Sequence, residues 1–134
     1  MHDELLEGAR ERERVQSIVG GFYAVYNYYG YGLNESVYAG ALDYELLDRG
    51  HEITRELSVA VSYKGRHVAW QRLYVVVDGS VIVETKATDR LTSAARTQLV
   101  NCLRASSFEV AVLLHFGPTP HFERFVDHLK RRCG

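Results

Sequence analysis

The first third of the chain shows the three- and four-residue spacing of apolar positions that is typical of helices. The pattern predicts one helix over residues 4–29 and a second that begins after Asn34 as its N-cap and ends near Arg49. Within the first helix, Gly20-Gly21 costs roughly 1 kcal/mol per glycine relative to alanine, so we expect a neighbouring element to pack closely there.

The rest of the chain alternates between strand and helix patterns. It predicts an antiparallel meander of three strands, then a helix, a strand buried on both faces and a closing helix. In order, the expected ranges are 52–63, 67–77, the strand that ends at Glu84-Thr85-Lys86, 92–106, 108–116 and 121–131. The prediction is an α/β fold with a mixed, mainly antiparallel four-stranded sheet and helices on both sides.

Composition adds few limits. A chain of 134 residues with 46% hydrophobic content predicts a single globular domain over residues 1–134. Its 16 Lys and Arg against 17 Asp and Glu give a formal charge of −1, so tight non-specific DNA binding is not expected. We expect a cytoplasmic protein without membrane contact, since no apolar signal core begins the chain and Cys102 and Cys133 show no metal spacing.

Glu84-Thr85-Lys86 is the segment that says most about chemistry. Because side chains alternate along a strand, Glu84 and Lys86 share one face and Thr85 points away. A carboxylate that holds a divalent cation beside an ammonium that orients water is what metal-assisted phosphodiester cleavage needs. Taken alone, the same pattern also describes a solvated ion pair.

A longer series of motifs surrounds this segment. Gly32, Glu35 and Tyr38 stand in the run Gly30-Tyr31-Gly32-Leu33-Asn34-Glu35-Ser36-Val37-Tyr38, and Gln98-Leu99 and Leu113-Leu114-His115-Phe116-Gly117 follow later. Over about residues 12–128 the chain resembles the GxxExxY family of small bacterial proteins, which belongs to the PD-(D/E)XK nuclease-like superfamily.

The resemblance implies a nuclease-like core and a role for each matching residue. Glu35 corresponds to the helix-borne acidic residue of a metal site, and Glu84 and Lys86 to the Glu and Lys of the signature. Gln98 corresponds to a glutamine that orients substrate or water. If the site is active, the expected cofactor is Mg²⁺ or Mn²⁺, with Glu35, Glu84 and the carbonyl of Thr85 as ligands; a site that has lost activity needs none.

One signature residue is missing. The family pattern carries an arginine and then, two residues later, an aspartate on the strand before the Glu-x-Lys motif; here Arg72 matches the arginine and Tyr74 replaces the aspartate. We take Arg72 and Tyr74 as candidate binding residues. A neutral phenol, with an ordinary pKa of about 10, is a poor ligand for a hard cation. Tyr26 replaces a histidine, and Cys102 replaces an aromatic residue.

The substitution also predicts a register. For Tyr74 to face Glu84, paired residue numbers must sum to 158 and the connection must be the three-residue loop Asp78-Gly79-Ser80. A two-residue Asp78-Gly79 turn would instead pair Tyr74 with Val83.

Three functions remain open from the sequence. The leading interpretation is a degenerate nuclease-like protein with weakened or lost metal-dependent DNA cleavage and a pocket that is structural or binds a ligand, DNA being at most a weak partner. The alternatives are an active Mg²⁺-dependent DNA nuclease and a homo-oligomeric interaction module that uses the tyrosine-rich first helix.

Overall fold

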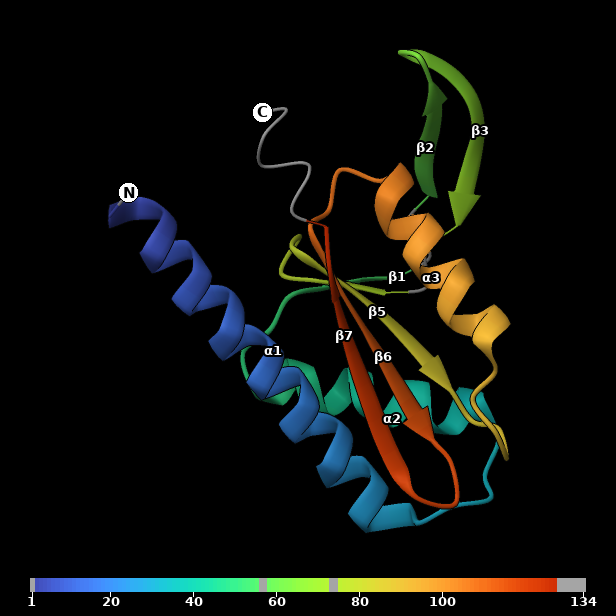
Figure 1. Ribbon diagram of the computed structural model, residues 1–134. Coiled ribbons are helices and arrows are strands. Elements are labelled where there is room, and N and C mark those ends of the chain that lie inside the picture. The colour runs from blue at the N-terminus through green and yellow to red at the C-terminus, as the bar shows by residue number, and fades with distance from the viewer. Residues whose placement is uncertain (1, 56–57, 73–74, 128–134) are drawn as a thin grey trace.

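The computed structural model describes residues 2–55, 58–72 and 75–127. It contains three helices and seven strands in these ranges (Figure 1). The helices are α1 (His2–Tyr29), α2 (Glu35–Asp48) and α3 (Ser93–Ala105); the strands are β1 (Ile53–Arg55), β2 (Ser58–Tyr63), β3 (Arg66–Arg72), β4 (Val75–Val77), β5 (Val81–Lys86), β6 (Val110–Phe116) and β7 (Pro120–Val126).

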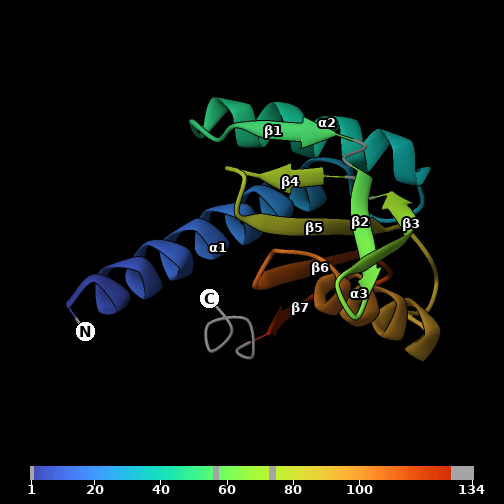
Figure 2. The same cartoon turned by 90° about the horizontal axis from the view of Figure 1, so that it is seen from above.

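Five of the strands form one sheet in the order β1-β4-β5-β6-β7. The β5–β6 pair is parallel and the other neighbours are antiparallel. Helices α1 and α2 cover one face of the sheet and α3 covers the other (Figures 1 and 2). The expected mixed, mainly antiparallel sheet with helices on both sides is therefore confirmed, with five strands in place of four.

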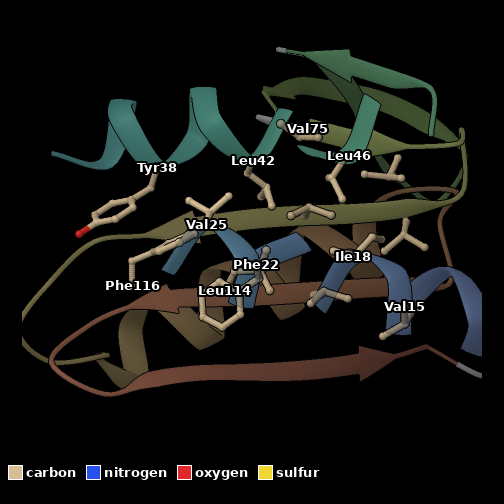
Figure 3. Packing of buried hydrophobic residues seen from close by; sticks show 14 of the residues in the cluster. Val15, Ile18, Phe22, Val25, Tyr38, Leu42, Leu46, Val75, Leu114 and Phe116 are labelled. Carbon is tan, nitrogen blue, oxygen red and sulfur yellow. The ribbon is translucent and has the colours of Figure 1, made fainter. Parts of the chain in front are cut away.

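The larger core lies between the sheet and the α1–α2 pair. Figure 3 shows Phe22 and Ile18 of α1, and Leu42 and Leu46 of α2, pointing toward the strands. The Phe22 ring meets Phe116 of β6 edge-on, with their centroids 4.7 Å apart. Every residue of β6 is buried, which is the outcome expected of a central strand with both faces covered.

Close packing of α1 on α2 explains the glycine pair. A Cβ built on Gly20 would lie 2.8 Å from the Arg49 guanidinium, and one on Gly21 would lie 3.0 Å from Cδ2 of Leu46. The expectation that a neighbour approaches the helix at this point is confirmed.

The last element differs from the prediction. Residues 121–131 were expected to form a helix, but Pro120–Val126 is strand β7, antiparallel to β6 at an edge of the sheet. The tight connection through Pro118 turns the chain straight back along β6. Pro120 starts the strand, a position where its missing N–H is tolerated. Phe122, Phe125 and Val126 of this strand fall at three- and four-residue spacing, which is also the spacing of a helix.

The predicted meander is also divided. Strand β1 pairs with β4 and β4 with β5, as expected, but β2 and β3 form a separate two-stranded hairpin with a turn at Lys64-Gly65. The expected strands over 52–63 and 67–77 therefore each contribute one part to the main sheet and one to the hairpin. Among the described helices, none combines the length and the apolar character that spanning a membrane requires.

The register between β4 and β5 is the predicted one. Val75 pairs with Val83, Val76 with Ile82 and Val77 with Val81, so each pair of residue numbers sums to 158. Asp78 and Gly79 both adopt positive φ in the connecting turn. Tyr74 itself lies outside the described residues.

Candidate functional site

Glu84 and Lys86 lie together at the carboxyl end of β5. Alternation along the strand places both on the face that carries Ile82, which packs in the cluster under α3, and places Thr85 on the opposite face, where it is buried. Lys86 Nζ lies 3.4 Å from Glu84 Oε1, and the two side chains are 28% and 16% exposed. Glu84 and Lys86 therefore share one face of β5, as the alternation predicts, and form an ion pair.

The side chain of Glu84 is largely buried, and its surroundings change the pKa of its carboxyl group. Burial raises the pKa of Glu84 above its ordinary range, and the charge of Glu35 adds to the rise, while Lys86 opposes both. The negative charge of Glu35 acting on the Glu84 carboxylate is the kind of field that favours a bound cation.

Tyr38 sets the position of Glu35. Its ring is fully buried and stacks on Phe116 with centroids 4.3 Å apart. Its hydroxyl donates to the carbonyl of Gly30 at 2.6 Å and accepts from the amide of Leu33 at 3.1 Å. These bonds hold the loop before α2, in which Gly32 has a φ of 116°. Glu35 is the first residue of α2, so the loop that Tyr38 holds determines where its exposed carboxylate lies.

The remaining candidates are placed less directly. Gln98 is exposed on α3 beside the buried Leu99, and within the described residues no hydrogen bond joins it to Glu84 or Lys86. Arg72 ends β3 opposite Ser58, and its side chain is outside the described part of the structure, as is all of Tyr74. The roles of Gln98, Arg72, Tyr74 and the Thr85 carbonyl stay predictions.

Three other residues singled out by their sequence positions serve packing. The Tyr26 hydroxyl donates to the carbonyls of Gly117 and Pro118, at 2.8 and 3.0 Å, and so ties α1 to the β6–β7 turn. Cys102 is buried in the cluster under α3. His115 is buried, and its Nε2 lies 2.8 Å from the carbonyl of Thr88. This contact gives the buried ring nitrogen a hydrogen-bond partner.

The donor set around Glu84 suits a hard cation by type. Carboxylate oxygens are the ligands that Mg²⁺ and Mn²⁺ prefer. In the part of the chain that the structure describes, however, no three Asp, Glu, His or Cys side chains gather closely enough to hold a metal ion. Glu35 and Glu84 therefore fit the metal by chemistry, but among the described residues no third side chain of these types joins them.

The fold and this site can now be compared with known proteins. A model of the PD-(D/E)XK nuclease superfamily matches residues 12–126, which include Glu35, Glu84, Lys86 and Gln98. The chain belongs to this superfamily. Neither the curated proteins nor the solved structures gave a match.

For this superfamily member, sequence reasoning missed a polar network at the other end of β5. Asp78 accepts from Arg14 Nε at 3.1 Å and lies 2.8 Å from Nδ1 of His51, whose Nε2 lies 2.7 Å from Ser17 Oγ. Burial alone would raise the pKa of Asp78, but the His51, Glu52 and Arg14 hydrogen bonds lower it overall. Arg14 of α1 thus helps to fix the β4–β5 turn.

A polar hollow of about 380 Å³ adjoins that network, between the start of α1 and the β4–β5 turn. It lies beside Gly79 and Ser80, before the first residue of β5, whereas Glu84 and Lys86 lie near the last. The candidate site is therefore identified by the chemistry of its side chains and not by this hollow.

Proposed function

We propose that this protein is a nuclease-derived domain whose metal-dependent cleavage of nucleic acid is weakened or lost. The observation that carries the proposal is the set of potential metal ligands. Glu84 is paired with Lys86, and the charge of Glu35 helps to raise the pKa of Glu84. Tyr74 stands at the position of the signature aspartate. Mg²⁺ prefers anionic oxygen ligands, and the change from aspartate to Tyr74 removes one of those that the signature supplies.

Each residue has a role when the site is loaded. Glu35 and Glu84 would hold Mg²⁺ or Mn²⁺, with the Thr85 carbonyl as a further ligand, and the bound cation supplies Lewis-acid stabilisation of phosphate charge. Lys86 orients the attacking water or stabilises negative charge on the phosphate. Gln98 orients the water or the substrate from α3.

The finer placement within the superfamily rests on the loop before α2. We propose that the chain is one of the GxxExxY proteins. The local geometry supports this: Gly32 takes a positive φ, Tyr38 holds the loop through Gly30 and Leu33, and Glu35 follows. The three motif residues therefore act together to position Glu35.

A working nuclease is the second candidate. The observation in its favour is that Glu84 and Lys86 retain their shared, half-buried position, with the pKa of Glu84 raised. In that case a water replaces the missing ligand. The domain would act on nucleic acid in both candidate functions, and the difference between them is the strength of metal binding and the rate of cleavage.

Mn²⁺ titration tests the proposal. We expect weak binding that is lost in Glu84→Gln and in Glu35→Gln. Glu13→Gln, which changes an exposed carboxylate on α1, should bind Mn²⁺ as the wild type does. Tight binding that Glu84→Gln abolishes would favour the working nuclease, and binding that neither Glu84→Gln nor Glu35→Gln changes would place the metal elsewhere and overturn the proposed site.

A further inference from the structure

The β2–β3 hairpin, residues 58–72 and called the hairpin arm below, stands away from the main sheet (Figures 1 and 2). It connects β1 to β4, and β4 begins at Val75. Val75 pairs with Val83, the residue before Glu84. The arm therefore leaves the sheet at the end where the candidate site lies.

The arm exposes large rings and apolar side chains that a projecting hairpin does not need for its own stability. Trp70 is 68% exposed, Tyr63 is 63% exposed and Val68 is 59% exposed. The rings of His67 and Trp70 lie 4.9 Å apart, and Lys64 Nζ lies 5.2 Å from the centre of the Tyr63 ring. Exposed apolar groups gathered on one element mark an interaction surface.

A bulge in β3 brings His67 and Trp70 together. Val61 pairs with Ala69 but Ser62 pairs with His67, so Val68 is an extra residue opposite β2. Side chains three apart in a regular strand point to opposite faces, whereas the extra residue restores His67 to the face of Trp70. The result is a two-ring platform on one face of the arm.

The charge of the arm differs from that of the rest of the chain. It contains Lys64, Arg66 and Arg72 and no Asp or Glu, so its formal charge is +3. Because the whole chain carries −1, the other residues together carry −4. The element that exposes the rings thus has a net positive charge, whereas the rest of the chain has a net negative charge.

We propose that the hairpin arm binds single-stranded nucleic acid, with unpaired bases stacked on Trp70 and His67 and the phosphate backbone held by Lys64 and Arg66 near the turn of the arm. Exposed aromatic rings interleaved with cations are the means by which proteins bind single strands without reading sequence. Stacking needs unpaired bases, so the arm selects single strands over blunt duplex. The proposal deepens the proposed function, on which it rests, by assigning the substrate class of the same domain.

Trp70 is the one tryptophan of the chain, so its fluorescence reports on the arm alone. The full-length protein is titrated with an unstructured oligothymidine in EDTA, where cleavage cannot occur, and again with a blunt duplex of equal length. We expect the single strand to quench Trp70 in a saturable way, with affinity that falls as salt rises. Binding in EDTA separates this proposal from cleavage, because an inactive site leaves the quenching intact.

Variants give the second measurement, by anisotropy of a labelled oligothymidine. Trp70→Ala should weaken binding about tenfold, since one base stack contributes roughly 1–3 kcal/mol. Tyr63→Ala, which removes a ring from the opposite face of the arm, should weaken it less. Lys64→Glu with Arg66→Glu should flatten the salt dependence. Tyr44→Ala, which removes a 74% exposed tyrosine from α2, is the matched control and should bind as the wild type does.

Several results would overturn the proposal. They are absence of quenching at low salt, equal affinity for blunt duplex, or affinity unchanged by Trp70→Ala in a variant whose circular dichroism and melting temperature match the wild type. A change from dimer to monomer in Trp70→Ala, without oligonucleotide binding by the wild type, would assign the arm to contact with a second copy of the chain instead.

Discussion

At the scale of single residues, Tyr38 links the sequence motif to the geometry of the site. Tyr38→Phe keeps the stacking on Phe116 but leaves the Gly30 carbonyl and the Leu33 amide without their partner. We predict a loss of about 1–3 kcal/mol of unfolding free energy, measured by chemical denaturation. Tyr44→Phe, at an exposed position of the same helix, should change it by less than about 0.5 kcal/mol. Equal effects of the two changes would contradict the role of Tyr38.

Burial of the charged Glu84 carboxylate lowers the stability of the folded protein. Its pKa is raised above the ordinary value of 4.5, so the folded state binds more protons than the unfolded state, and stability falls as pH rises through this window. Glu84→Gln should therefore raise the melting temperature at pH 7, because Lys86 is exposed enough to be hydrated without its partner. The gain should vanish below about pH 4.5, where the wild-type carboxyl is itself protonated. A variant less stable than the wild type at pH 7 would show that the ion pair stabilises the fold.

At the scale of elements, the α1–α2 contact requires glycine where a side chain from α2 or its C-cap approaches the backbone of α1. Gly21→Ala would place a Cβ 3.0 Å from Leu46 and should cost about 1–3 kcal/mol by overpacking. Gly40→Ala, inside α2 with nothing within 4 Å, should instead stabilise by about 0.5–1 kcal/mol through helix propensity. Thermal unfolding of the two variants checks the pair, and destabilisation by Gly40→Ala would contradict it.

Local signals predicted the elements whose pattern matches their environment. Helices α1, α2 and α3 lie within two residues of their expected bounds, since each has a periodic apolar face and a glycine or polar residue at its ends. The β4–β5 register was predicted from the requirement that Tyr74 face Glu84, which fixed the loop as Asp78-Gly79-Ser80. Strand β7 was mistaken for a helix because its identity depends on pairing with β6, a tertiary contact that the charged sequence from His121 to Arg124 does not encode locally.

At the scale of the whole molecule, the sequence predicted which residues form the site but not how strongly they bind a metal ion. Strand alternation alone gives the Glu84–Lys86 pair. The approach of Glu35 depends on how α2 packs on the sheet through Tyr38 and Phe116, which are 78 positions apart in the sequence. The hairpin arm was missed because its two strands read as parts of longer ones, and the bulge at Val68 appears only in the pairing.

The most direct test of the central claim is a cleavage assay on plasmid and single-stranded DNA, in Mg²⁺ and in Mn²⁺, with wild type, Tyr74→Asp and Glu84→Gln at equal concentration. The account predicts feeble or undetectable cleavage by the wild type and none by Glu84→Gln. It predicts increased cleavage by Tyr74→Asp, because an aspartate restores the missing anionic ligand. Robust wild-type cleavage that disappears in Glu84→Gln would contradict the account and identify the protein as a working nuclease.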